Sequence, residues 1–285
     1  QGGKRMKPKT KKKCIRIFIL YIPLACFLIF IGIPLFWALS LSFREGQSII
    51  SGEFRILPEN WILDNYLYVW KTNNLNVYFR NSLITSFGAV FVVGVLSLFN
   101  GYALSRFDFP FKRCFMILLL MTQMVPIIFN MTPIFLMMSK LNLVNSLFGI
   151  ILLHIASGIP YNSLMMKSFI GAIPKEIDEA AAIDGCNRAQ VIFKVIFPAV
   201  RPGFTTVIAY AFITCWNEYL LSYTLLTDAK KFPISVGLKY LVGEYSTDYA
   251  ALAAGCIIAL IPPILLFAYV QKHLVSGLNA GAVKG

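Results

Sequence analysis

Charge is scarce in this sequence. Only 14% of its 285 residues are Asp, Glu, Lys or Arg, whereas 58% are hydrophobic, and the mean hydropathy is +0.70. A water-soluble globule of this size needs more charge to cover its surface. The composition therefore excludes a purely soluble protein and indicates that lipid is part of its solvent.

Motifs for catalysis and metal binding are also missing. No Gly-x-x-x-x-Gly-Lys-Ser/Thr run is present to hold nucleotide phosphates, and no Gly-x-Ser-x-Gly or His-Glu-x-x-His run is present for hydrolysis. The six cysteines lack metal-ligand spacing and the only histidines are His154 and His273. We expect no enzyme active site, metal or cofactor in this chain, and His154 to be a hydrogen-bonded packing residue.

Long uncharged stretches are what the sequence has instead. A helix of about 20 mostly apolar residues crosses the hydrocarbon core of a bilayer. Five stretches without any charge and one that carries only Glu218 exceed this length, at residues 17–43, 81–105, 114–139, 141–166, 202–227 and 249–271. The fold class predicted is an all-α integral membrane protein with six transmembrane helices, in which residues 17–271 form the membrane domain.

The distribution of basic residues predicts the orientation. Placing both termini in the cytoplasm puts 18 of the 26 Lys and Arg residues there, as the positive-inside rule requires. Eight of them lie in residues 1–16, a basic cytoplasmic segment that directly precedes a span and lacks interleaved aromatic residues. The net charge of +13 is therefore read as a topology signal rather than as a nucleic-acid-binding surface. The first span is too long for a cleaved signal peptide and is expected to stay.

Residues 44–80 form the longest predicted outer segment, and they are rich in Trp and Tyr. Two interpretations are open: an aromatic belt at the membrane interface, or a docking surface for an extracytoplasmic partner. A turn followed by a short helix near Asp64 is expected within it.

The stretch at 173–198 between the fourth and fifth spans is predicted to fold as two short helices around a glycine. Glu176, Asp178 and Glu179 suit the first turn of one helix, and Gly185 suits its left-handed end. Asn187-x-x-Gln190 is typical of a capping box that opens a second helix, which is expected to run to Phe197 and end before Pro198. This object suits a knob inserted into the groove of a partner, although a solvated loop is the simpler interpretation.

The same stretch resembles the permease subunits of binding-protein-dependent ABC importers. Their signature reads Glu-Ala-Ala, three residues, Gly, nine residues, Ile-x-Leu-Pro, and the chain has Glu179-Ala180-Ala181, Gly185 and Val195-Ile196-Phe197-Pro198 at this spacing. The apolar replacements Val195 and Phe197 are the departures. Leu57-Pro58-Glu59-Asn60, Trp216-Asn217-Glu218-Tyr219 and the ending 276–285 resemble the carbohydrate branch, specifically the six-helix second permease of maltose-type importers.

That resemblance implies partners and residue roles. The partners are a second permease in a heterodimer, a dimer of cytoplasmic ATPases that bind ATP and Mg, and an extracytoplasmic sugar-binding protein, all at a bacterial cell membrane. The residues expected to couple to the ATPase are Glu179, Ala180, Ala181, Asp184, Gly185 and Pro198. In the cytoplasmic tail, residues 272–285, Gly277, Asn279 and Gly281 are expected to contact the ATPase dimer, with a frayed terminus as the alternative.

Polar side chains within the spans are the remaining candidates. Asn130, Asn162, Asn217 and Glu218 are predicted to lie along the translocation path or to gate it, and interhelical hydrogen bonding is the plainer alternative for each. Glu218 is expected to face a cavity or a cation because an intramembrane carboxylate is expensive. Pro126, Pro133 and Gly158-Ile159-Pro160 are expected to kink their helices.

Two functions from different classes fit these observations. The first is the pore-forming half of an ATP-driven importer of a sugar or oligosaccharide. The second is an ion-coupled secondary transporter or channel that acts without an ATPase, for which midplane ionisable pairs and inverted repeats are expected. The chain has one such acid and no visible repeat, which favours the importer.

Overall fold

The computed structural model describes residues 17–45, 57–58, 60–242 and 247–282, with the side chains of Ile17 and of residues 272–282 left out. Within these ranges the secondary structure is helical apart from an isolated bridge between Val242 and Thr247. Two compact units are present: residues 1–73 with 241–258, and residues 74–240 with 259–285. The basic 1–16 segment and Glu59 lie outside the described residues.

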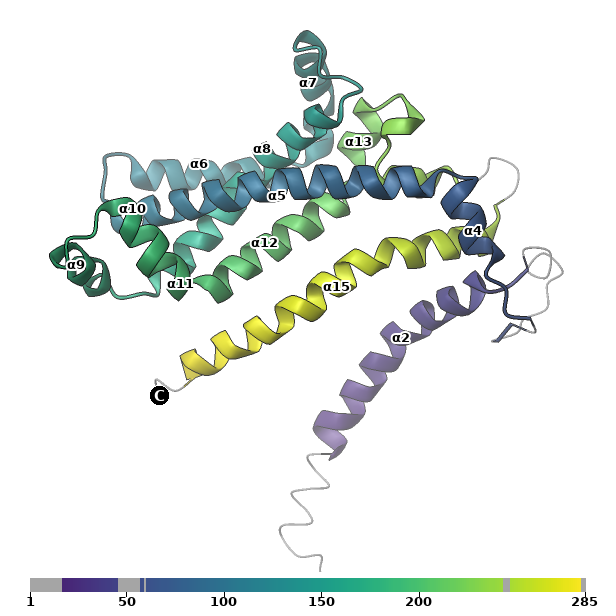
Figure 1. The fold of residues 1–285 in the computed structure, drawn as a ribbon, viewed down its shortest axis with the longest axis horizontal. Helices are drawn as coiled ribbons and strands as arrows, with labels where there is room; N and C mark the ends of the chain where they lie inside the picture. The colour runs from purple at the N-terminus through teal and green to yellow at the C-terminus, as the bar shows by residue number, and fades with distance from the viewer. Residues whose placement is uncertain (1–16, 46–56, 59, 243–246, 283–285) are drawn as a thin grey trace, which may run out of the picture. The chain divides into compact units, whose positions relative to one another are not determined.

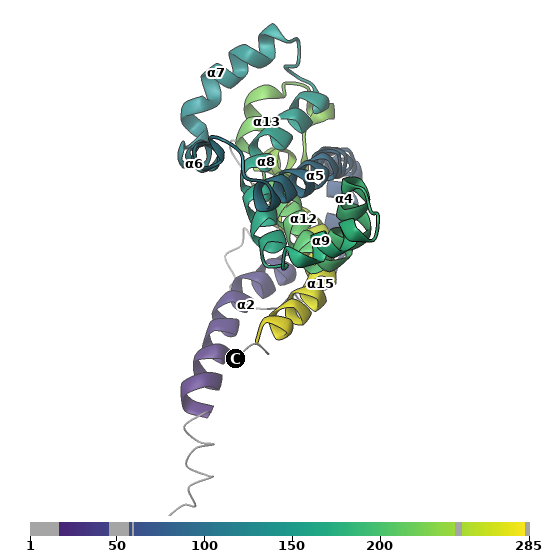
Figure 2. The same ribbon diagram turned by 90° about the vertical axis from the view of Figure 1, so that its left-hand side faces the viewer.

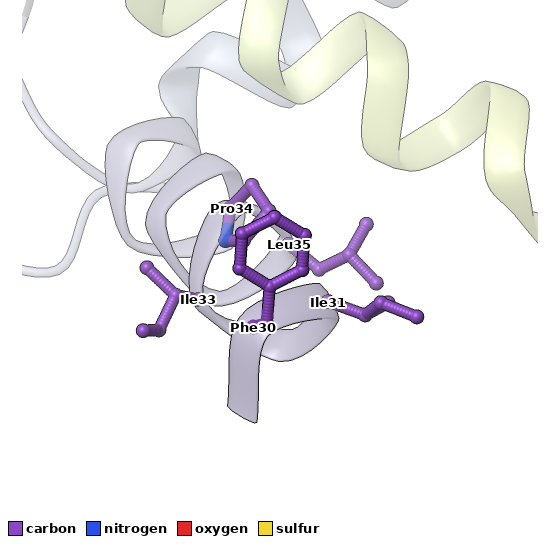
Figure 3. Close-up of a pocket in the computed structure, with 5 residues that line it drawn as sticks. All are labelled: Phe30, Ile31, Ile33, Pro34 and Leu35. Carbon is purple, nitrogen blue, oxygen red and sulfur yellow. The ribbon is translucent and has the colours of Figure 1, made fainter. Parts of the chain in front are cut away.

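The first unit contains α2 (Ile22–Ser42), preceded by the π-helical turn η1 (Ile17–Tyr21), and the short α4 (Asp64–Lys71). The most apolar stretch of the span Phe18–Ser42 contains no buried residue. Figure 3 shows part of this surface, where Phe30, Ile31, Ile33, Pro34 and Leu35 surround a shallow apolar hollow on α2. A surface of this chemistry fits lipid or another apolar helix rather than water.

A short helix is present near Asp64 as predicted, but no side-chain cap forms at its start. It packs on the end of α2. Asn65 Nδ2 donates to the carbonyl oxygens of Ser42 and Arg44, at 2.9 and 2.8 Å. The hydroxyls of Ser42 and Tyr66 lie 2.7 Å apart. The first of these bonds satisfies the carbonyl of Ser42, the last residue of α2, which has no partner within the helix.

The second unit is built around α5 (Leu75–Arg106), which packs along α8 (Leu147–Gly171) and α12 (Arg201–Trp216) (Figure 1). Small residues let these backbones approach closely. A Cβ atom added to Gly101 of α5 would lie 2.8 Å from Met166 Cβ and 2.9 Å from the Lys167 nitrogen on α8. The α5–α8 crossing therefore depends on glycine at this point.

The predicted span 114–139 is two helices rather than one. α6 (Lys112–Met124) and α7 (Ile127–Lys140) meet at a bend of 98°. Pro126 lacks an N–H and disfavours helical geometry at the residue before it, and Val125 is accordingly extended, with ψ 117°. Figure 2 shows α7 leaving the bundle of α5 and α8 after this bend.

The predicted span 202–227 is also interrupted. α12 ends at Trp216 and the short α13 (Leu220–Leu225) follows after a three-residue break that contains Glu218. The fourth span is not unwound, because α8 runs through Pro160 as one continuous helix. By length and composition the described residues hold four helices able to span a membrane, or six if each bent pair counts as one.

Three further helical segments follow α13 in the chain. η3 (Ala229–Lys231) and α14 (Ile234–Lys239) pack beside the start of α5, where Asn81 Nδ2 donates to the carbonyls of Lys230 and Phe232 at 2.9 and 3.0 Å. α15 (Tyr249–Ala282) extends beyond the predicted end of its span at 271. The backbone at Gly277, Asn279 and Gly281 is therefore helical, and residues 283–285 lie outside the described part.

Candidate functional site

The 173–198 loop has the predicted helix–glycine–helix form. α9 (Glu176–Ile183) carries all three acids in its first turn, and α10 (Arg188–Gln190) continues as the π-helical η2 (Val191–Ile196) and α11 (Phe197–Ala199). Between them Gly185 has φ +82°, the left-handed conformation that favours glycine. The Asn187–Gln190 capping box is present, with reciprocal bonds of 2.8 and 2.9 Å.

The second helix of the loop does not end before Pro198, contrary to the prediction. It continues to Ala199, because the wider turn of η2 directly before Pro198 replaces the regular bonding pattern that the proline ring would break. The direction of the chain changes only afterwards, where 188–199 meets α12 at 84°.

The loop has one buried and one open face. Ala181 is buried in a core formed with side chains of α5, α8 and η2, among them Tyr102, Ile170 and Ile192. The other expected coupling residues are exposed, namely Glu179, Ala180, Asp184, Gly185 and Pro198. Ile177 and Ile183 are apolar residues on α9 that are 42% and 87% exposed. An acidic and apolar surface of this kind fits a protein groove.

Glu218 stabilises the broken fifth span. Its Oε1 accepts from the backbone N–H of Leu221 at 2.6 Å, and its Oε2 accepts from the N–H and the hydroxyl of Ser222 at 3.1 and 2.8 Å. These are the N–H groups that α13 leaves free at its start. The carboxylate therefore acts as the cap of α13, and Ser235 holds the Glu218 carbonyl oxygen at 2.6 Å.

His154 of α8 faces the same carboxylate, with its Nε2 3.7 Å from Glu218 Oε2. The imidazole is 3% exposed, and neither of its nitrogens has a hydrogen-bond partner within the described residues. This distance is too long for a hydrogen bond. His154 is therefore a buried packing residue as predicted, but the hydrogen bond predicted for it is absent among the described residues, and a sequence separation of 64 residues gave no sign that it would face Glu218.

Two cavities adjoin Glu218. The larger, of about 640 Å³, is also lined by Gln123, Asn217 and Tyr219, and the smaller, of about 60 Å³, by Tyr161, Asn162 and Tyr210. Gln123, Ser157 and Glu218 border both. The structure thus brings Asn162, Asn217 and Glu218 to one polar region. Asn130 of α7 lines neither cavity, although its neighbour Met131 lies against α13, with Thr224 Oγ1 3.6 Å from Met131 Sδ.

Tyr219, which lines the larger cavity, belongs to an aromatic pair. The rings of Tyr219 and Tyr223 are stacked, with centroids 5.3 Å apart, and Lys239 Nζ lies 4.0 Å from the centroid of Tyr223. Hydrogen bonds to Tyr223 and Tyr219 raise the pKa of Lys239, so the ammonium keeps its charge at neutral pH. Sequence analysis missed this group because its members are distributed over α13 and α14.

Long apolar helices, a polar cavity at a helix break and an exposed helix–glycine–helix loop define a membrane permease that works with another protein. Residues 91–279 match the family described as the inner membrane component of binding-protein-dependent transport systems. The chain belongs to this family, whose members are transport subunits rather than enzymes.

Named transport permeases are similar to this chain over nearly its whole length. The galactooligosaccharides transport system permease protein GanQ of Bacillus subtilis is 32% identical, covering 96% of this chain and 98% of its own. The inner membrane ABC transporter permease protein YcjP of Escherichia coli is 31% identical over 97% of this chain and 99% of its own. A solved bacterial ABC transporter for import of the acidic polysaccharide alginate has the same fold, with a TM-score of 0.79, 23% identity and coverage of 95% and 99%.

Proposed function

We propose that this chain is one of two transmembrane subunits of an ATP-driven importer that moves an oligosaccharide into a bacterial cell. The 173–198 loop carries the proposal, because it presents an exposed acidic and apolar face on a helix that is itself anchored to the membrane bundle. The substrate class follows from relatives such as GanQ, which is a permease for galactooligosaccharides.

The proposed topology has six spans and both termini in the cytoplasm. The bent pair 112–140 then counts as one span, and α12 with the short α13 forms the fifth span, so that 188–199 stays outside the membrane. The excess of Lys and Arg in residues 1–16, 106–113 and 167–201 supports this orientation. It puts the 173–198 loop in the cytoplasm and the outer segment 44–80, Tyr219 and Lys239 toward the other side.

The proposed partners follow from this arrangement. A dimer of ATPases, which bind ATP and Mg, engages the 173–198 loop through Glu179, Ala180, Asp184, Gly185 and the turn at Pro198, with Ala181 supporting the helix from inside. The tail around Gly277, Asn279 and Gly281 contacts the same dimer. A second permease completes the pathway, and an extracytoplasmic sugar-binding protein delivers the substrate.

The translocation path is proposed to run along the two cavities at Glu218. Asn162 and Asn217 supply amide groups, and Tyr161, Tyr210 and Tyr219 supply rings, which is the mixture of polar and aromatic surface that suits a sugar. Asn130 belongs to this proposal only as a residue of α7 that a partner permease would meet.

Purification and reconstitution test the function. The chain is expressed with the permease, ATPase and binding-protein genes that neighbour it, and purified in mild detergent. We expect an ATPase and a second permease to co-purify, and proteoliposomes to take up galactooligosaccharides or maltodextrins only with ATP and the binding protein. Isolation of the chain alone, with uptake driven by an ion gradient, would instead support the secondary transporter.

A further inference from the structure

The end of α5 is joined to the 173–198 loop by a buried ion pair. Arg106 is the last residue of α5, and its Nε and Nη2 donate to Oδ2 and Oδ1 of Asp178 at 2.9 and 3.0 Å. The side chains of Arg106 and Asp178 are 6% and 15% exposed. Two parallel bonds between guanidinium and carboxylate fix orientation as well as distance. The pair therefore sets how α9 is rotated on the end of α5.

Asp178 lies on the side of α9 that faces the bundle. Ala181, three residues later and on the same face, is buried, whereas Glu179 and Ala180 are exposed. α9 is thus held on one face and open on the other. A force applied to the exposed face of α9 is therefore transmitted through the contacts that hold its buried face.

The other half of the loop contacts the same end of α5. The guanidinium carbon of Arg188, the first residue of α10, lies 4.7 Å from the ring centroid of Phe107, which directly follows Arg106. The Phe107 ring in turn meets Tyr102 edge-on at 5.9 Å. A cation over an aromatic face is an attractive contact. Both sides of the Gly185 elbow are therefore attached to one point of α5.

The covalent connections of α9 run to other helices. The chain from α8 into α9, residues 171–176, borders an open hollow of about 430 Å³ together with Ser105 and Arg106, and its Ile173 packs against the apolar core that includes Tyr102. On the other side 188–199 meets α12 at an angle of 84°. The apolar core and the Arg106–Asp178 fork both hold α9 on the end of α5, and the fork is the directional contact of the two.

We propose that Arg106 is a positioning residue that makes α9 and α5 move as one body. Through Asp178 it transmits displacement of the 173–198 loop to α5, the helix along which α8 and α12 pack. This inference rests on the proposed docking of an ATPase on the loop. The inference adds one contact to that function, the Arg106–Asp178 ion pair. Through this contact α5 moves with the loop, although the two are distant in sequence.

Hydrogen–deuterium exchange on the purified complex tests this joint, with ATP and orthovanadate as the probe. In the unmodified complex we expect the probe to change exchange both in α9, residues 176–183, and in the last turns of α5, residues 99–106. In Asp178→Asn and in Arg106→Gln the change in α9 persists, whereas the change in 99–106 falls by about tenfold. The exchanged pair Arg106→Asp with Asp178→Arg restores it.

An exposed ion pair beside the joint provides the matched control. Lys112 Nζ lies 3.0 Å from Asp108 Oδ1, and the Asp108 side chain is 87% exposed. Asp108→Asn removes an ion pair that includes no residue of α9, and it is expected to leave both responses as they are in the unmodified complex. Arg106→Lys keeps the charge but loses the fork, and an intermediate response is expected.

A purely structural ion pair gives a different pattern. Neutral variants would then melt at lower temperature, while the surviving complex would show the full response in residues 99–106, and that result overturns the proposal. If Asp178→Asn does not assemble, the exchanged pair decides: assembly with a restored response supports the joint, and failure to assemble or to respond contradicts it. Absence of any ATPase from the unmodified preparation would instead refute the proposed function.

Discussion

Glu218 combines a structural and an electrostatic task at one residue. It caps α13 with both carboxylate oxygens, and it is the nearest acid to a buried imidazole, His154. A helix break inside a membrane exposes backbone N–H groups that lipid cannot satisfy. The carboxylate is needed there for its acceptor oxygens even before any role in transport.

Removal of the charge alone is therefore expected to be tolerated at this residue. Glu218→Gln keeps one acceptor oxygen for the start of α13 and retains much of the uptake, whereas Glu218→Leu loses both acceptors and abolishes uptake. Uptake by proteoliposomes of the complete complex is the measurement, with assembly checked by size-exclusion chromatography. Equal loss in the two variants would show that the charge itself, through His154, is required.

Glycine is needed at position 185 because of the backbone conformation and not because space around it is short. A Cβ atom at this position would meet no atom within 4 Å, but φ is +82°. Gly185→Val is expected to destabilise the elbow by about 1–2 kcal/mol and to uncouple ATP hydrolysis from uptake, while Gly185→Asn, which accepts left-handed geometry, stays coupled. The ratio of uptake to ATP hydrolysed measures this. Normal coupling in the valine variant would rule out a fixed elbow.

The existence of the long helices follows from the sequence, but their ends and their path do not. Gaps between charged residues located α5, α8 and α15 because a uniformly apolar run has one stable form in lipid, the helix. However, α5 begins before the predicted 81, α8 begins at 147 rather than 141, and α15 continues past 271. The same gaps could not reveal the bend at Pro126 or the break at Glu218. Proline alone does not determine whether a span is interrupted, since α8 stays helical through Pro160.

The close packing of α5 on α8 allows us to predict how a substitution at Gly101 changes stability. Gly101→Ala places a methyl group against the backbone of Met166 and Lys167, and we expect a loss of about 1–3 kcal/mol, seen as a lower melting temperature in detergent. Gly171→Ala is the control, because the nearest atom to its Cβ is Ser105 Oγ at 3.7 Å. Equal melting temperatures for the two variants would mean that the helices separate easily at Gly101.

The C-terminal end of the molecule is predicted to take part in coupling. Deletion of residues 277–285 removes the last turns of α15 and is expected to lower substrate-stimulated ATPase activity at least about fivefold in the assembled complex. Deletion of 283–285 alone is the control and is expected to have a smaller effect. Full stimulation after the longer deletion would exclude the tail from the mechanism.

Across the whole molecule, the sequence predicts local features, but it does not predict contacts between residues that are distant in the chain. The capping box at Asn187 and the turn at Gly185 depend on neighbours in sequence, so their residues predict them. The contacts of Arg106 with Asp178 and of His154 with Glu218 join residues 72 and 64 positions apart. Such pairs depend on how the helices pack, which composition and periodicity do not specify.

The central position of α5 also has a consequence for biosynthesis. The ribosome completes α5 before α8 and α12 exist, and at about 5–20 residues per second the first of these partners follows only seconds later. During that interval the serines at 82, 86 and 97, which are buried in the finished protein, have no neighbouring helix. Slow codons downstream of Arg106 would lengthen this interval, and we expect them to lower the yield of inserted permease.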